Sequence, residues 1–394
     1  MKNALIILLQ TVSILTFSQS KVFVNNNLNS VEDPSKRQKI IENLSQFILD
    51  KNVANENLKI VNPKNKLETW LFLDELRNQQ NSKIFTTKFT LMYEIISTEA
   101  VDKNSYTIHL NCYFEDGKIK QPVAKIQILL QEINDEFLLS STFPGNISNW
   151  KSKTLENYTF YSEKSIDEKK LKDFITKNNR ISLNLNEKKR PTKVILTDGF
   201  VNAYKILGIN YITGESNTEN MFFGVDFTTD NSNSILIVAT QDGKIDSFSF
   251  GSLFKARITK KYPRENLYLP ALEGYSYIND GHPFYKWEQI WIDFKNTYSA
   301  TQKTDWLSLY GNKENFSLAS TPLYLENLLN GIIIRKVEKE KGFSKVLELL
   351  NCGRFNIENQ ENYFKTLERI SGITKSNFNE KIDELISIEN KKNE

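Results

Sequence analysis

The sequence predicts an α+β protein: helices and an antiparallel sheet come first, and a smaller sheet is then followed by a long series of helices. Between residues 84 and 142, runs rich in β-branched and aromatic residues alternate with turn residues, which is typical of strands. After residue 281, apolar residues recur instead at helical spacing. The chain has 394 residues, enough for two domains that each bury a core.

The first residues have the pattern of a targeting segment. Lys2 is followed by an apolar run over residues 4–17, and Thr16-Phe17-Ser18 forms a small-x-small site before Gln19. This pattern predicts a cleaved signal peptide over residues 1–18, and therefore an exported protein, periplasmic or extracellular. The run is too short and too polar to favour a stable membrane span, and an uncleaved helix at a membrane surface is the alternative.

Composition gives no support for nucleic acid, an anionic membrane or structural zinc as a partner of this chain. Charged residues make up 25% of the chain and the formal net charge is +3, which gives no reason to expect nucleic acid or an anionic membrane surface as a partner. The two cysteines, Cys112 and Cys352, lie in different halves of the chain. We expect two free thiols rather than a disulfide, and two cysteines are too few for a structural zinc site.

A first domain is predicted over residues 31–150. A helix begins at Asp33-Pro34-Ser35, and the other predicted elements are a helix over 67–76 and strands over 84–96, 105–115, 123–132 and 136–142. In the strand over 105–115, the apolar set containing Ile108, Leu110 and Cys112 alternates with polar residues, as in a half-exposed antiparallel strand. Helices followed by such a sheet are similar in order to the cone-like NTF2 fold.

The polar face of that strand is a candidate ligand site. It carries His109, Asn111 and Tyr113. If this face is the concave one, these side chains would line a pocket for a small molecule. If it is the convex one, they face solvent.

The second domain is predicted over residues 157–390. It begins with a strand over 158–162, a helix over 165–176 and short strands over 194–196 and 235–238. Two helices follow: the first contains Phe248, Phe250, Leu253, Phe254 and Ile258, and the second Leu269, Leu272, Tyr275 and Ile278. The remaining helices are expected over 284–298, 322–336, 343–350, 362–370 and 377–388.

The second of these two helices resembles a known motif. Leu272-Glu273-Gly274 is followed by Tyr275, Tyr277 and Gly281. This pattern resembles xxEGxAxYxxG of the gluzincin peptidases of the peptidase MA type, in which the Glu completes a zinc site and the preceding helix carries HExxH. The closing helices, from KGFSKVLELLNCG onward, are also similar to that family. The resemblance covers about residues 158–388 and implies a zincin-like domain.

The first helix departs from the motif. Where HExxH would stand, the chain has Gly251, Ser252, Leu253, Phe254 and Lys255. Glycine offers no ligand, serine is a poor one, and lysine places a cation where a cation would bind. The resemblance therefore implies a scaffold that has lost its metal and needs no cofactor. Glu273 is either paired with Lys255 or Arg257 across the former cleft, or a surface residue at a helix start.

Other sites are poorly supported. His282 follows a turn, where Asp280 and Glu288 could join it on a metal, but a solvated loop histidine is the simpler interpretation. The chain contains no GxSxG, Walker A or GxGxxG motif. Trp287, Trp291 and Phe294 share one helical face, which favours core packing over a carbohydrate platform.

Taken together, the sequence predicts an exported, catalytically inactive metallopeptidase-like protein, which would bind a peptide or protein in the former active-site cleft. In zincins an extended peptide pairs with an edge strand of the sheet, and here that strand is expected near residues 235–238. The alternatives are an active hydrolase that uses Glu273 with displaced ligands, and small-molecule binding by the N-terminal domain.

Overall fold

The computed structural model describes most of the chain in two compact units. The described residues are 21–24, 28, 31, 33–49, 53–81, 90–115, 120–212, 224–240, 242–245, 250–282, 284–298, 304–318, 321–356 and 360–393. The first unit comprises residues 1–167 and 190–247, and the second comprises residues 168–189 and 248–394. The predicted signal peptide over 1–18, and Phe248, lie outside the described residues.

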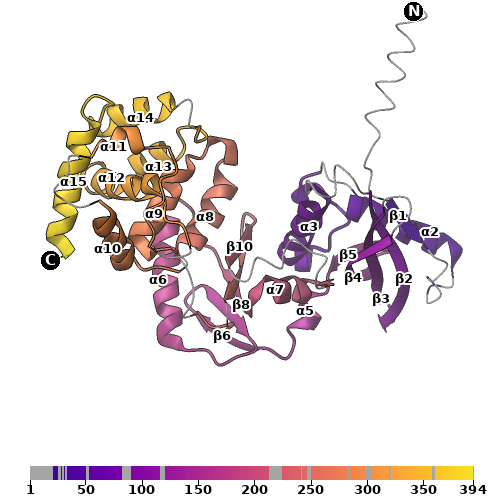
Figure 1. Cartoon of the computed structure of the whole chain (residues 1–394). Helices are drawn as coiled ribbons and strands as arrows, with labels where there is room; N and C mark the ends of the chain where they lie inside the picture. Colours follow the sequence, from indigo (N-terminus) through magenta and orange to yellow (C-terminus); the bar gives the residue numbers. More distant parts are fainter. Residues whose placement is uncertain are drawn as a thin grey trace, which may run out of the picture. The chain divides into compact units, whose positions relative to one another are not determined.

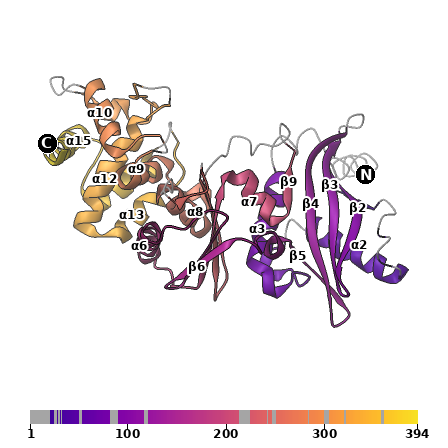
Figure 2. The same cartoon turned by 90° about the horizontal axis from the view of Figure 1, so that it is seen from below.

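The first unit contains a sheet of six described strands (Figure 2). The strands are β1 (Lys21–Val24), β2 (Thr90–Asp102), β3 (Ser105–Glu115), β4 (Lys120–Ile133) and β5 (Glu136–Ser141), in that order, with β9 (Ile209–Tyr211) also pairing with β4. Neighbouring strands from β2 to β5 are antiparallel, and β1 joins β2 in parallel. The predicted antiparallel sheet is thus confirmed, with β1 and β9 as unpredicted additions.

One face of this sheet is apolar. The helices α2 (Pro34–Leu49) and α3 (Lys66–Asn81) both contact β5. Ile108, Leu110 and Cys112 of β3 are buried in the same hydrophobic core as these helices. The alternation expected along β3 therefore holds up to Cys112, after which a register shift relative to β4 leaves Tyr113 buried as well.

The second sheet also belongs to the first unit. Its strands are β6 (Lys151–Leu155), β7 (Tyr158–Ser162), β8 (Thr192–Asp198), β10 (Gly224–Thr229) and β11 (Ser234–Thr240), and they lie in the order β10-β11-β8-β7-β6. The pairs β7–β8 and β8–β11 are parallel, whereas β6 and β10 join antiparallel at the two ends. The mixed sheet expected from the sequence is confirmed. The prediction of an edge strand near 235–238 is wrong, because β11 lies between β10 and β8.

The two sheets share one hydrophobic core. Ile195 of β8 and Ile235 and Ile237 of β11 belong to the same cluster as the first sheet, together with Leu207 of α7 (Gly199–Leu207). The polar stretch predicted as a domain boundary holds the short helix α5 (Phe143–Asn146) and strand β6. The two units therefore divide the chain differently from the domains expected over 31–150 and 157–390.

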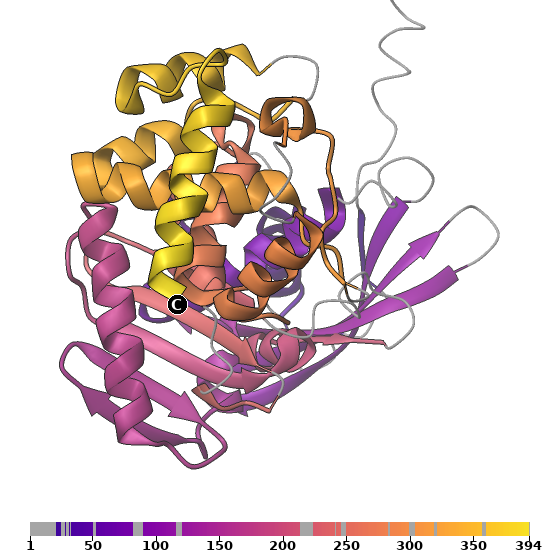
Figure 3. The same ribbon diagram turned by 60° about the vertical axis from the view of Figure 1, so that its left-hand side comes forward.

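The second unit is helical (Figures 1 and 3). Its helices are α6 (Glu168–Asn184), α8 (Phe250–Lys261), α9 (Leu269–Asp280), α10 (Trp287–Thr297), α11 (Trp306–Leu309), α12 (Leu325–Lys341), α13 (Phe343–Leu350), α14 (Glu361–Ser371) and α15 (Phe378–Asn393). Short 3₁₀ turns lie at Arg264–Asn266 and, in the first unit, at Asn55–Asn57 and Pro63–Asn65. The predicted C-terminal series of helices is confirmed.

Helix α12 is the centre of this bundle. It contacts α9, α13, α14 and α15, and its buried side chains cover most of its circumference, as expected for a helix surrounded by others. Trp291 and Phe294 of α10 are each 1% exposed, which confirms the predicted core packing for these two residues, whereas Trp287 is half-buried. Within the described part of the chain, no helix is both long and apolar enough to span a bilayer.

Both cysteines are free thiols, as expected. Cys112 is buried in the first unit and Cys352 is half-buried in the second. Burial raises the pKa of each thiol to about 12. Both are therefore protonated and poorly nucleophilic at neutral pH.

Candidate functional site

The candidate site is the contact between helices α8 and α9. The apolar face of α8 buries Phe254, whose ring centroid lies 4.4 Å from that of Tyr275 on α9. Pro270 in the first turn of α9 suits a helix start, and Gly281, with φ of 85°, ends the helix in a conformation that favours glycine. This packing brings the positions that resemble the gluzincin motif to one side of the helix pair.

Lys255 and Glu273 form an ion pair at this contact. The Lys255 Nζ lies 2.5 Å from Glu273 Oε2, and the two side chains are 32% and 35% exposed. Of the two partners that the sequence offered for Glu273, the structure selects Lys255. The ammonium donates a hydrogen bond to the carboxylate oxygen that a metal would need. This oxygen is therefore already paired with a full positive charge.

Arg257, the other candidate partner, faces a different helix. It is 4% exposed and donates to the Asn178 side chain at 2.6 Å and to Ser182 Oγ at 2.9 Å, both on α6, and it also pairs with Glu187. A buried guanidinium needs such a set of acceptors to offset its desolvation. Arg257 therefore joins α8 to α6.

Gly251 allows the two helices to approach closely. A Cβ built on Gly251 would lie 2.8 Å from both Cβ and Oγ of Ser276, nearer than real Cβ contacts come. An imidazole at this position would have to displace α9. Ser252, the next residue, is half-buried. The first position of the HExxH comparison thus provides no ligand and no space for one.

The charges of Lys255 and Glu273 act on His282, a relationship that the sequence did not predict. Burial lowers the pKa of His282; the charge of Glu273 acts in the opposite direction, and that of Lys255 lowers the pKa further. The loop is held by the backbone bond from His282 N to Tyr285 O, at 2.7 Å. His282 lies 27 residues after Lys255 and 9 after Glu273, and no sequence motif relates these positions. The turn at Gly281 brings His282 near the pair.

The donors around this site do not suit a metal. Among the residues that the structure describes, no three His, Cys, Asp or Glu side chains are grouped so that they could hold one. Asp280 and Glu288, the acids considered as partners of His282, form no such group with it. At Glu273 the neighbouring charge is the ammonium of Lys255, which would repel a divalent cation.

The N-terminal candidates lie on the polar face of β3 and have partners there. His109 Nε2 is 3.5 Å from Glu99 Oε2. Lys120 lies over the Tyr113 ring, 4.6 Å from its centroid, and donates to its hydroxyl at 3.3 Å. Asn111 is half-buried. Two cavities of the structure, described next, do not include these residues.

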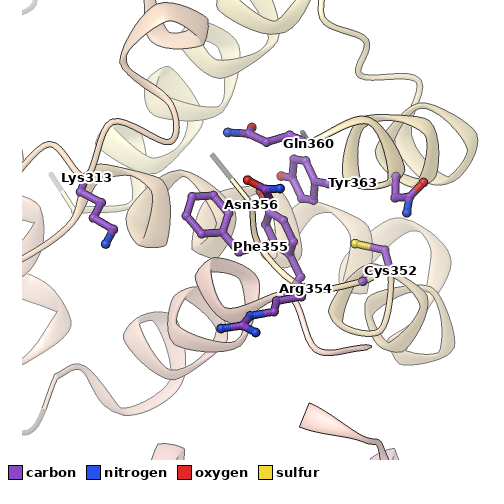
Figure 4. A pocket seen from close by; sticks show the side chains of 10 residues that line it. Lys313, Cys352, Arg354, Phe355, Asn356, Gln360 and Tyr363 are labelled. Atoms are coloured by element: carbon purple, nitrogen blue, oxygen red, sulfur yellow. The ribbon is translucent and has the colours of Figure 1, made fainter. Parts of the chain in front are cut away.

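A cavity of about 280 Å³ in the first unit lies at the start of α3 and beside β7, β8 and β11. Two of its three lysines have acidic partners: Lys66 pairs with Asp230 at 2.6 Å, and Lys193 with the buried Glu68 at 2.5 Å. The larger cavity, of about 720 Å³, lies in the second unit and contains Lys313, Arg354 and Phe355 (Figure 4). Neither was predicted, because the lining residues are far apart in the sequence.

No family model, no curated protein and no solved structure matches the chain. The likeness to the gluzincin peptidases is therefore an interpretation of this chain's own residues, above all Glu273 and Gly274.

Proposed function

We propose that the chain is an exported, catalytically inactive relative of the zinc peptidases, in which an ion pair takes the place of the metal. The observation that carries this proposal is the contact between Lys255 and Glu273. Lys255 stands at the second histidine position of the HExxH comparison, and Glu273 at the position of the third ligand. Their contact is what a zincin helix pair would be expected to keep after a lysine replaced the histidine.

Charge compensation supports this interpretation. A zinc site places a dication among neutral imidazoles and a carboxylate, and the metal also holds the two helices together. In this chain the ammonium of Lys255 neutralises Glu273 and joins α8 to α9 without a metal. The close approach at Gly251 removes the space for a ligand there. Hydrolysis by a zinc-bound water has no place to occur in this arrangement.

The ligand class that fits this proposal is an extended peptide. Zincins bind peptides by main-chain hydrogen bonds to an antiparallel edge strand, a mode that needs no metal. Among the described strands of the mixed sheet, β10 lies at one end and is antiparallel to β11. β10 therefore replaces residues 235–238 as the candidate peptide-binding strand.

A peptidase assay tests the inactive state. The full-length protein, with and without an equivalent of Zn²⁺, would be incubated with a mixture of quenched fluorescent peptides, beside a Glu273→Gln variant. We expect wild type and variant to show the same background rate under both conditions. Zinc-dependent cleavage that the variant loses would contradict the proposal and favour the hydrolase alternative.

Hydrogen–deuterium exchange tests the peptide-binding mode. The protein would be mixed with unstructured peptides from a digest of a denatured protein, and the exchange of each segment compared with and without them. Strand addition predicts slower exchange in residues 224–229. Unchanged exchange there, at peptide concentrations up to the millimolar range that weak edge pairing would need, would contradict the peptide proposal.

A further inference from the structure

The larger cavity of the second unit has the composition of a ligand site. It occupies about 720 Å³ between the loop after α13, the start of α14 and the segment around Lys313. A cavity of this size can hold a small organic molecule. Figure 4 shows Lys313 on one side of Phe355 and Tyr363 on the other, with Asn356 between the two rings and Gln360 above them.

The charges on its lining are all positive. Of the ten residues around the cavity, Lys313 and Arg354 are cationic and none is Asp or Glu. Both cations are exposed. Among the described residues, the charge of Lys313 acts on the buried Glu326, whereas Arg354 forms no ion pair. Two cations on a lining that contributes no carboxylate attract an anion and can donate hydrogen bonds to it.

The floor of the cavity is aromatic. The rings of Tyr268 and Tyr363 stack with centroids 4.3 Å apart and are nearly completely buried. Their hydroxyls are engaged away from any ligand: Tyr363 donates to Asn330 Oδ1 at 2.9 Å, and Tyr268 shares a hydrogen bond of 3.1 Å with Tyr310. The network fixes both rings beneath the cavity. Phe355, edge-to-face with Tyr268 at 5.5 Å, adds a further ring that is only half-buried.

Carboxamides complete the lining. Asn356, Gln360 and Asn362 each carry an amide that donates through nitrogen and accepts through oxygen. The amide of Gln360 packs against Gly311, where φ is 90°. A Cβ at Gly311 would overlap the amide nitrogen of Gln360, so this position of Gln360 requires glycine there. Side chains that both donate and accept suit hydroxyl groups, which do the same, better than they suit a bare inorganic ion.

We propose that this cavity binds an acidic sugar, a monosaccharide that carries a carboxylate or a phosphate. Arg354 and Lys313 bind the acidic group, the three carboxamides bind the hydroxyls, and Phe355 packs against the apolar face of the sugar ring. Each part of the lining thus has a counterpart in this class of ligand. A neutral sugar would leave Arg354 without a counter-charge, and inorganic phosphate would leave the carboxamides and Phe355 unused.

Isothermal titration of the full-length protein with four probes tests this assignment: D-glucuronate, glucose 6-phosphate, glucose and inorganic phosphate. We expect at least one of the two acidic sugars to bind with a Kd of about 1 mM or tighter, and glucose and phosphate to bind at least about tenfold more weakly, the scale of one lost charged hydrogen bond. Arg354→Ala should weaken binding about tenfold or more, and Lys313→Ala by a similar or smaller factor.

The control variant is Lys339→Ala, which removes an exposed cation of α12 outside the cavity and should leave binding unchanged. Circular dichroism would verify that all variants are folded. The assignment is overturned if neither acidic sugar binds up to tens of millimolar, if glucose or phosphate binds as tightly as the acidic sugars, or if the folded Arg354 variant binds like wild type.

Discussion

Gly274 of α9 and Gly331 of α12 lie backbone to backbone. A Cβ built on Gly274 would come within 2.6 Å of the Gly331 nitrogen, and one on Gly331 within 2.9 Å of the Gly274 oxygen. Because neither residue has a side chain, the two helices can cross at a distance that no other residue type allows. The glycine of the Glu-Gly pair thus has a packing role next to the ion-paired Glu273.

We therefore expect Gly274→Ala to lower the free energy of unfolding by about 3 kcal/mol, the upper end of the usual range for overpacking, because only backbone movement can relieve this contact. Denaturation by urea, followed by circular dichroism, measures this change. Gly145→Ala is the control, since a Cβ there meets nothing within 4 Å, and it should shift stability by less than about 0.5 kcal/mol. Equal effects of the two substitutions would refute the packing role.

A second prediction concerns Gly251, whose added Cβ would meet a side chain rather than backbone. Gly251→Ala should destabilise the protein by about 1–3 kcal/mol, because Ser276 Cβ cannot rotate away. Ser276→Gly removes that atom, so the double variant should regain part of the lost stability compared with the sum of the two single changes. Strict additivity of the two effects would show that Gly251 and Ser276 do not limit the helix contact.

A double-mutant cycle measures the ion pair itself. Lys255→Met, Glu273→Gln and their combination should give a coupling energy of about 0.5–1 kcal/mol, since the pair is partly shielded from solvent, and 1 M NaCl should reduce it. The matched control is the pair Lys365–Glu361, with side chains 70% and 64% exposed, for which coupling near zero is expected. A coupling at Lys255–Glu273 no larger than in the control would mean that the pair does not hold the helices together.

The buried Glu326 predicts a pH dependence of stability. It is 3% exposed, its Oε2 has no hydrogen-bond partner among the described residues, and burial raises its pKa above the usual 4.5. The folded state therefore holds this proton more tightly than the unfolded state, so the stability that Glu326 contributes is lost as pH rises above about 4.5.

Glu326→Gln removes the ionisation. The difference in stability between this variant and wild type should therefore favour the variant more at pH 8 than at pH 5. Thermal unfolding of both proteins at both pH values measures this difference. The same difference from wild type at both pH values would show that Glu326 does not titrate with the raised pKa.

Much of the fold could be predicted because its periodic segments are long and strongly patterned. The strand over 105–115 and the helix over 343–350 were predicted with the bounds that the structure has. β6 was missed because its sequence, KSKTL, is exposed and has no apolar alternation. Without β6 and β10, the buried run of β11 was placed wrongly at the edge of the sheet.

The site was predicted only in part, for a related reason. Motif spacing along two consecutive helices offered Lys255 and Arg257 as partners of Glu273, beside a surface position at a helix start, and the structure shows the pair with Lys255. The three-dimensional arrangement is needed to show that Arg257 bonds to α6, and that the charges of Lys255 and Glu273 act on the pKa of His282. The cavity at Arg354 depends on tertiary contacts between segments some 40 residues apart, Lys313 and Arg354, which no local pattern records.

The metal content of the purified full-length protein tests the account most directly. After incubation with one equivalent of Zn²⁺ and dialysis, elemental analysis should find far less than one zinc per chain, and Glu273→Ala should not change that value. One zinc per chain that Glu273→Ala abolishes would contradict the account, because the carboxylate would then be bonded to a metal in place of Lys255.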